Sequence, residues 1–251
     1  VMETTYGDRL HKPIEPSIAE LFAAIRDTLQ RGGNVIIPTF ALERAQELLF
    51  YLRRGIEEGE LPQRLPVFLD SPMAISATEI FRHHPECYGE EVDALFRKGQ
   101  DPFALPGLRF VRETADSIAL NRLVGGAVIM AGSGMATGGR VRHHLRHNLW
   151  RSDSSVVFVG YAARGTLARL LIDGARTVRL FGDEIPVHAQ LHTINGFSAH
   201  ADQRELLAWQ QALRPTRTIL VHGDPDSMDT FAALLKDTEV NRPAQGEVIE
   251  L

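Results

Sequence analysis

Residues 17–37, SIAELFAAIRDTLQRGGNVII, contain a helix signal followed at once by a strand signal. Ser17 and Glu20 have the spacing of a capping box, and apolar residues recur at helical intervals as far as Leu29, after which two glycines end the run. Residues 34–37 then form a short apolar segment bounded by glycine and proline, which is typical of a buried strand. This stretch therefore predicts a helix that leads into a buried strand.

The same alternation of short apolar segments and helical patterns continues to about residue 172. Strands are predicted at 67–69, 108–111, 127–130 and 156–159, and helices at 41–54, 74–83, 117–123, 140–149 and 166–172. Short apolar strands that alternate with helices are typical of a parallel sheet covered on both faces. The predicted fold class is therefore α/β, with a mostly parallel sheet flanked by helices.

The pattern changes after about residue 175. Residues 178–187 place a polar turn between two apolar runs and predict a hairpin, and residues 188–194 alternate like a strand. The remainder predicts a helix at 205–213, a strand at 218–221 and a final helix at 228–236.

Composition limits the class of protein. The 251 residues are 44% hydrophobic, which is enough to bury one large core or two smaller ones. Cys87 is the only cysteine, so one chain can form neither a disulfide nor a thiolate zinc site, and we expect a cytoplasmic setting. No apolar run has the length of a bilayer span, so no membrane association is expected. The net charge of −5 indicates that any nucleic-acid site must be local.

Two histidines lie where ligand-binding residues of α/β proteins collect, close to predicted strand and helix ends. His222 follows the strand predicted at 218–221, although an isolated histidine there would more often cap a turn. His200 precedes a helix whose first N–H groups favour anions, although Ser198 or Asp202 could simply cap that helix.

A glycine-rich segment, 132–139, follows the strand predicted at 127–130. Its backbone N–H groups could hold a phosphate, but its spacing matches neither the Walker motif nor the dinucleotide fingerprint. The next helix carries a basic cluster of Arg140, Arg142, His143, His144, Arg146 and His147. Arg140, His144 and His147 share a face by their spacing. A solvated surface and a surface for a phosphate backbone explain that face equally well.

Three short motifs occur in the order of motifs A, B and C of the β-CASP nucleases, a branch of the metallo-β-lactamase superfamily. They are residues 3–8 (ETTYGD), 197–202 (FSAHAD) and 220–224 (LVHGD), and further matches lie at 33–41, 44–48, 132–135, 160–161 and 165–167. Over nearly its whole length the chain thus resembles the bacterial and archaeal RNA-processing members, relatives of the endonuclease that cleaves messenger-RNA 3′ ends.

The resemblance implies zinc-dependent hydrolysis of RNA phosphodiester bonds, in which two zinc ions supply the attacking hydroxide. His222 would be a zinc ligand, and His200 the general acid, held in its protonated form by Glu3. DNA-directed members usually lack the histidine of motif C, so His222 favours RNA. The residues expected to bind single-stranded RNA are Ser198, Gly132, Ser133, Gly134, Met135 and Arg140.

The resemblance also implies how the chain is divided. Residues 1–7 would end one metallo-β-lactamase segment, 8–197 would be the β-CASP domain, and 198–251 the C-terminal segment of an αββα metallo-β-lactamase domain. The family's His-x-His-x-Asp-His metal motif is absent, so we expect an incomplete fragment that holds no zinc pair and is inactive alone. The alternative is a non-catalytic RNA-binding or dimerisation module, and a homodimer fits either hypothesis. An α/β hydrolase is excluded, because 132–134 lacks the spacing of a nucleophile elbow.

Overall fold

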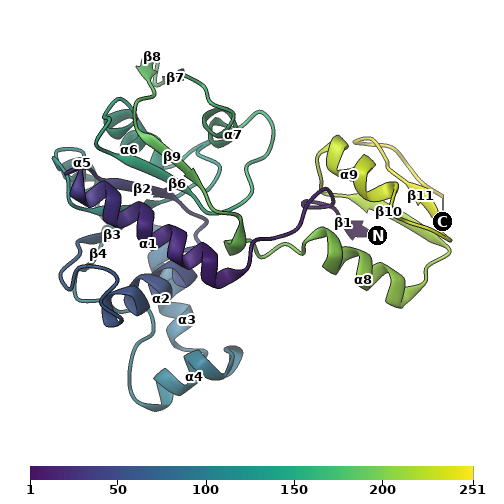
Figure 1. The fold of residues 1–251 in the computed structure, drawn as a ribbon, viewed down its shortest axis with the longest axis horizontal. Coiled ribbons are helices and arrows are strands. Elements are labelled where there is room, and N and C mark those ends of the chain that lie inside the picture. Colours follow the sequence, from purple (N-terminus) through teal and green to yellow (C-terminus); the bar gives the residue numbers. More distant parts are fainter. Residues whose placement is uncertain (251) are drawn as a thin grey trace. The chain divides into compact units, whose positions relative to one another are not determined.

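The apolar segments between residues 14 and 197 form one parallel sheet in the computed structural model, which describes residues 1–250 (Figure 1). The strand order is β4-β3-β5-β2-β6-β9, and every neighbouring pair is parallel. The strands are β2 (Val35–Pro38), β3 (Val67–Leu69), β4 (Leu108–Phe110), β5 (Val128–Ala131), β6 (Ser155–Phe158) and β9 (Gln190–Thr193). The predicted α/β class is confirmed.

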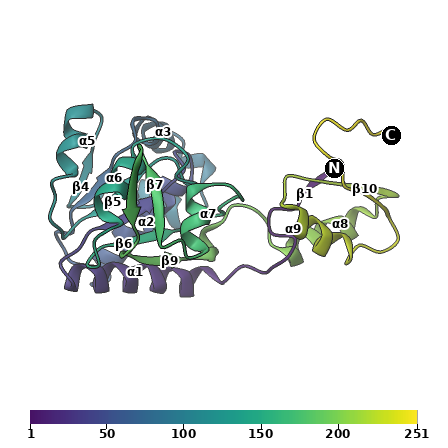
Figure 2. The ribbon, with the colours of Figure 1, turned by 90° about the horizontal axis from the view of Figure 1, so that it is seen from above.

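Helices cover both faces of this sheet. Successive strand residues point to opposite faces, and accordingly Val35 and Ile37 of β2 join one core cluster while Ile36 joins the other. The first cluster includes side chains of α1 (Ile14–Gln30), α2 (Arg44–Glu57) and α3 (Pro72–Arg82). The second includes side chains of α5 (Thr114–Leu120), α6 (Val141–Asn148) and α7 (Leu167–Ile172). Figure 2 shows α1 running along the sheet, where it contacts β2 and β6.

The smaller elements of this region differ more from prediction. The hairpin expected at 178–187 is present as β7 (Thr177–Leu180) and β8 (Asp183–Pro186), which pair antiparallel. The short elements η1 (Pro85–Cys87), α4 (Glu90–Arg97) and η2 (Asn195–Phe197) were not predicted. The capping box expected at Ser17 is wrong: α1 begins at Ile14, and Ser17 is buried within the helix. A proline is tolerated in the first turn of a helix, so Pro16 did not prevent the earlier start.

The two ends of the chain form a second, smaller sheet. β1 (Met2–Glu3) pairs in parallel with β10 (Arg217–Val221), which pairs in parallel with β11 (Glu239–Asn241). α8 (Gln203–Leu213) and α9 (Pro225–Ala232) belong to the same region. A small core holds it together, made of Met2, Leu206, Leu220, Phe231 and Leu235.

The chain therefore divides into two units. The terminal unit consists of Val1–Pro13 and Ser198–Leu251, and the insert unit of Ile14–Phe197. That the terminal unit belongs to a metallo-β-lactamase domain stays a prediction, as do the boundaries at residues 7 and 197 that the sequence suggested. Within residues 1–250, no helix combines the length and the apolar character needed to cross a membrane.

Candidate active site

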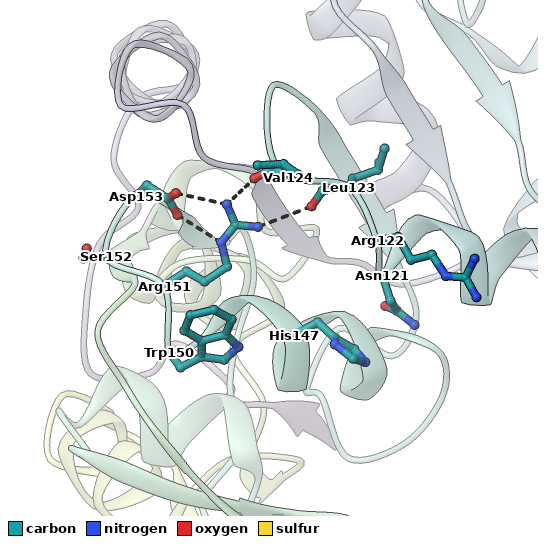
Figure 3. Close-up of a pocket in the computed structure, with 9 residues that line it drawn as sticks. All are labelled: Asn121, Arg122, Leu123, Val124, His147, Trp150, Arg151, Ser152 and Asp153. Atoms are coloured by element: carbon teal, nitrogen blue, oxygen red, sulfur yellow. Dashed lines mark hydrogen bonds and ion pairs between the residues drawn. The ribbon is translucent and has the colours of Figure 1, made fainter.

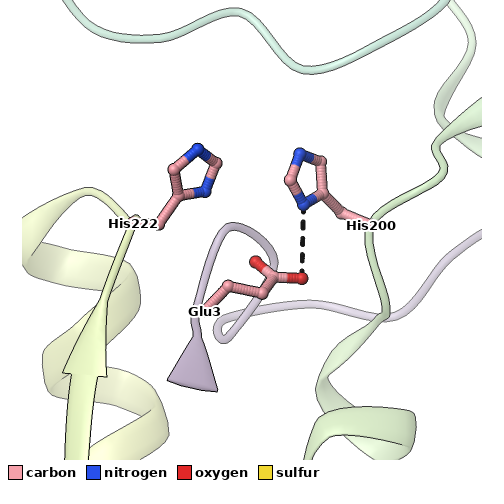
Figure 4. A group of neighbouring side chains, drawn as sticks. All are labelled: Glu3, His200 and His222. Atoms are coloured by element: carbon pink, nitrogen blue, oxygen red, sulfur yellow. Dashed lines mark ion pairs between the residues drawn. The ribbon is translucent and has the colours of Figure 1, made fainter. Parts of the chain in front are cut away.

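Three side chains meet at the carboxyl ends of the paired strands β1 and β10. Glu3 ends β1 and lies opposite Val221 in the parallel register, so it is brought next to His222, the residue after β10. His200 lies in the segment that leads into α8. Figure 4 shows the two imidazoles side by side with Glu3 beneath them, and the ring centroids are 5.2 Å apart.

The contact expected between motifs A and B is present. His200 Nδ1 lies 3.3 Å from a carboxylate oxygen of Glu3, within the range of an ion pair. The other carboxylate oxygen of Glu3 accepts the backbone N–H of Thr5 at 2.7 Å. Burial alone would raise the pKa of Glu3, but the contacts with Thr5 and with His200 outweigh it and lower that pKa. Glu3 is therefore an ionised acceptor for His200 at neutral pH.

Thr5 had no role in the sequence analysis, yet its hydroxyl connects the two histidines. Thr5 Oγ1 donates to the backbone oxygen of His222 at 3.1 Å, and it lies 3.1 Å from His222 Nδ1 and 3.4 Å from His200 Nδ1. With its own proton directed to this carbonyl, the Thr5 oxygen is placed to accept from His222 Nδ1–H. A neutral His222 protonated at Nδ1 has its lone pair on Nε2. Figure 4 shows this outer nitrogen pointing away from Glu3.

His11 is a second residue that the sequence analysis missed. Its Nε2 donates to the backbone oxygen of His200 at 2.8 Å, and its backbone N–H donates to Asp202 at 3.1 Å. Asp202 also caps α8 in a capping box with Glu205. Burial would raise the pKa of Asp202, but the two backbone N–H donors outweigh it and lower that pKa. The His200 segment is thus held from both sides within the terminal unit.

The donor atoms at this site fit zinc in type. One ligand atom from each of Glu3, His200 and His222 can be chosen so that all lie within 4.8 Å of one another. Imidazole nitrogen and carboxylate oxygen are usual zinc ligands, and three protein ligands suffice for a single catalytic zinc. A two-zinc centre needs more ligands than these three supply. The geometry therefore fits one zinc ion held here, or His222 as a ligand beside a Glu3–His200 pair.

The glycine-rich loop 132–139 follows β5 in the insert unit and borders a cavity of 490 Å³ at the carboxyl ends of β2, β3 and β5. Several of its polar groups face the loop itself: Ser133 N–H donates to Gly138 O, and Ser133 Oγ accepts from Gly138 N–H. A Cβ on Gly134 would lie 2.6 Å from the Phe40 ring, so this glycine allows close packing. RNA binding by Gly132, Ser133, Gly134 and Met135 stays a prediction.

The basic face expected on the helix after Arg140 is partly wrong. His144 is fully buried, and its Nε2 donates to the buried carboxylate of Asp70 at 2.6 Å. It belongs neither to a solvated surface nor to a phosphate-binding one. Arg140 donates to Asp70 at 2.8 Å and to the backbone oxygens of Val111 and Arg112 at 3.0 and 2.8 Å. Its proposed RNA contact is untested, but these partners already hold its guanidinium.

Asp70 is the centre of this network and was not singled out by the sequence analysis. Ser117 Oγ donates to it at 2.6 Å, in addition to the bonds from His144 and Arg140. Burial would raise the pKa of Asp70, but these three donors outweigh it and lower that pKa. Its position directly after β3 was the only signal in the sequence.

The chain matches two protein-family models. A family model described as the Beta-Casp domain matches residues 45–171, which lie within the insert unit. The chain belongs to the β-CASP family. A second model, the Zn-dependent metallo-hydrolase RNA specificity domain, matches residues 184–243 of this β-CASP chain, including His200 and His222.

Named relatives of this β-CASP chain come from bacteria and archaea. It is 42% identical over 247 residues to ribonuclease TTHA0252 of Thermus thermophilus, covering 98% of the chain and 56% of that relative. It is 36% identical over 238 residues to transcription termination factor FttA of Pyrococcus horikoshii, covering 90% of the chain and 36% of the relative. The Methanocaldococcus jannaschii FttA is 34% identical over 250 residues, covering 94% of the chain and 39% of the relative. The chain thus spans about half the length of the first relative and less of the others.

Proposed function

We propose that this chain is part of a zinc-dependent hydrolase of RNA phosphodiester bonds, to which it contributes the general acid, one metal ligand and an RNA-binding insert. The observation that carries the proposal is the Glu3–His200 contact of 3.3 Å beside His222, at the ends of two paired strands. Membership in the β-CASP family and similarity to a protein named a ribonuclease support this chemistry.

In this proposal His200 donates the proton that the departing oxygen needs. Its Nδ1–H is bound by the Glu3 carboxylate, and its Nε2 points away from Glu3 (Figure 4). A general acid in this position typically contributes about 10²–10⁴-fold to the rate. Glu3 acts through His200, so it is a positioning residue.

His222 is proposed to hold zinc through Nε2, and Thr5 selects the tautomer that leaves this nitrogen free. When bound, zinc supplies Lewis-acid activation of water and of the scissile phosphate. A second zinc ion would take its ligands from sequence outside this chain. Single-stranded RNA is the proposed substrate, and Ser198, whose hydroxyl accepts the His200 N–H at 3.2 Å, lines the cavity beside His200.

The test is single-turnover cleavage of a labelled single-stranded RNA by the complete protein that contains this chain. His200→Ala should slow cleavage by about 10²–10⁴-fold. Glu3→Gln should slow it less, because the imidazole stays but loses its carboxylate partner. His84→Ala is the matched control, since His84 is exposed in the insert unit and pairs only with exposed Glu86 among the residues described.

Two results would count against the proposal. An unchanged cleavage rate in His200→Ala would show that His200 is not the general acid. The complete protein, loaded with zinc, could instead bind RNA and fail to cleave it. That result would replace the hydrolase with the alternative of a non-catalytic RNA-binding or dimerisation module.

A further inference from the structure

A pocket of 520 Å³ opens in the insert unit at the amino-terminal ends of β5 and β6 (Figure 3). Residues 121–124, which precede β5, form one wall, and residues 150–153, which precede β6, form the other. The glycine-rich loop 132–139 follows β5 and so lies at the opposite edge of the sheet. The pocket is therefore separate from the loop to which the sequence analysis assigned RNA binding.

Arg151 fixes the shape of this pocket. Its guanidinium donates to the backbone oxygens of Leu123, at 3.3 Å, and Val124 on the opposite wall. It also donates twice to Asp153, at 3.2 and 3.0 Å, so its charge is matched. Figure 3 shows these bonds spanning the two walls. The pocket is thus preorganised, which lowers the entropic cost of binding a ligand there.

Asn121 Oδ1 lies 3.1 Å from His144 Nδ1, which leaves Trp150, Arg122 and His147 as the groups of the pocket that can contact a ligand. Trp150 is 54% exposed, and tryptophan is enriched at binding surfaces because its large ring provides much contact area. The Arg122 guanidinium makes no hydrogen bond or ion pair with any of residues 1–250, and the exposed His147 ring makes no hydrogen bond with them either. With Arg151 neutralised by Asp153, Arg122 gives the pocket a net positive charge.

Imidazole, guanidinium and phenyl groups continue from the pocket along α6, where burial lowers the pKa of His143 and of His147, so the guanidinium carries the positive charge. His143 lies one turn before His147, so the two share a face of the helix. The His143 ring stacks on Phe181 at 4.3 Å, and the Arg142 guanidinium lies 5.0 Å from the centre of the same ring. Alternating cationic and aromatic groups are what single-stranded nucleic acids bind, through phosphates and stacked bases. A ligand longer than one nucleotide would find further contacts on this helix.

We propose that this pocket binds one nucleotide of a single-stranded RNA, with its base stacked on Trp150 and its phosphates on Arg122 and His147. The identity of the polymer rests on the proposed function. The volume of 520 Å³ lies within the roughly 300–1,000 Å³ typical of small-ligand sites. The pocket belongs to the insert unit, whereas Glu3, His200 and His222 belong to the terminal unit. RNA bound in the pocket would therefore add affinity without taking part in the chemistry.

The chain has two tryptophans, which makes Trp150 a local reporter. In a Trp209→Phe variant of the 251-residue chain, a single-stranded ten-nucleotide oligouridylate should quench the fluorescence of Trp150 in a saturable manner. A duplex of the same length should not, because its bases are already stacked and paired. Trp150→Ala should weaken binding of the labelled oligonucleotide by about 5- to 100-fold, and Trp150→Phe should restore most of the affinity.

The phosphate contact has its own test. Arg122→Gln should lower the slope of log affinity against log salt by about 0.7, the value of one phosphate contact on a single strand. Arg97→Gln is the matched control, because its side chain is 74% exposed on α4 and away from the pocket. This control should leave the slope unchanged.

Two outcomes would overturn the proposal and are distinguishable from failure of the proposed function. If the oligonucleotide bound without quenching Trp150, and Trp150→Ala bound equally well, RNA would lie elsewhere while the hydrolase proposal stood. If the chain bound no single-stranded RNA at all, the pocket proposal would fail. The hydrolase proposal would still be decided separately by cleavage with the His200→Ala variant of the complete protein.

Discussion

Replacing Asp70 with asparagine should destabilise the insert unit strongly. The buried carboxylate accepts from Ser117, His144 and Arg140 at 2.6, 2.6 and 2.8 Å. The amide nitrogen of asparagine donates and cannot accept, so at least one of these donors would lose its partner inside the protein. Breaking a buried charged pair costs about 3–5 kcal/mol. For a unit of this size each kcal/mol lowers the Tm by about 2–4 °C, so a drop of about 6–20 °C is expected.

Thermal unfolding followed by circular dichroism measures this effect, with Asp173→Asn as the matched control. Asp173 pairs with Arg169 on an exposed helix surface, and such pairs contribute about 0.5 kcal/mol or less. Because the pKa of Asp70 is lowered in the folded state, its contribution is complete above the ordinary value of 3.8 and is lost as the pH falls below it. The difference between the unaltered chain and Asp70→Asn should therefore shrink in acid. Equal Tm values for Asp70→Asn and Asp173→Asn at pH 7 would show that the buried Asp70 network does not stabilise the insert unit.

Two further substitutions test local packing and the site. Gly33→Ala should lower the free energy of unfolding, measured by urea titration, by at least the roughly 1–3 kcal/mol typical of overpacking, because its Cβ would lie 1.9 Å from the backbone oxygen of Asp153. Gly89→Ala, with open space around it, should leave that free energy unchanged. Thr5→Val should reduce the zinc affinity of the complete protein by about 10- to 100-fold in a metal-competition titration, since the hydroxyl that orients His222 is lost, and an unchanged affinity would contradict that role.

The fold class was accessible from the sequence because the strands of a parallel sheet are buried on both faces and read as continuous apolar runs. The residues of β2 illustrate this, since all of Val35–Pro38 are buried. α4 was missed although Val92, Leu95 and Phe96 share one face of it, because the helix has only eight residues and none of its side chains is fully buried. The start of α1 was misplaced because Ser17 and Glu20 mimic a cap that the chain does not use.

Contacts across long sequence separations were the part that the sequence could not supply. The meeting of Glu3 with His200 followed from recognised motifs. The role of Thr5 depends instead on the register of β1 against β10, which brings Thr5 to His222, 217 positions away. Likewise, the spacing of basic residues on α6 did not reveal that His144 faces a carboxylate 74 positions away. Periodicity identifies a face of a helix but not what covers it.

In the proposed mechanism His222 holds zinc while His200 supplies the proton. The most direct measurement is the zinc content of His222→Ala and His200→Ala variants of the complete protein, determined beside their single-turnover cleavage of a labelled RNA. His222→Ala should lose zinc, because a ligand holds the metal, whereas His200→Ala should retain it and cleave about 10²–10⁴-fold more slowly. Loss of zinc from His200→Ala as complete as that from His222→Ala would contradict the division of roles, and would instead make both imidazoles ligands with Glu3 of one metal site.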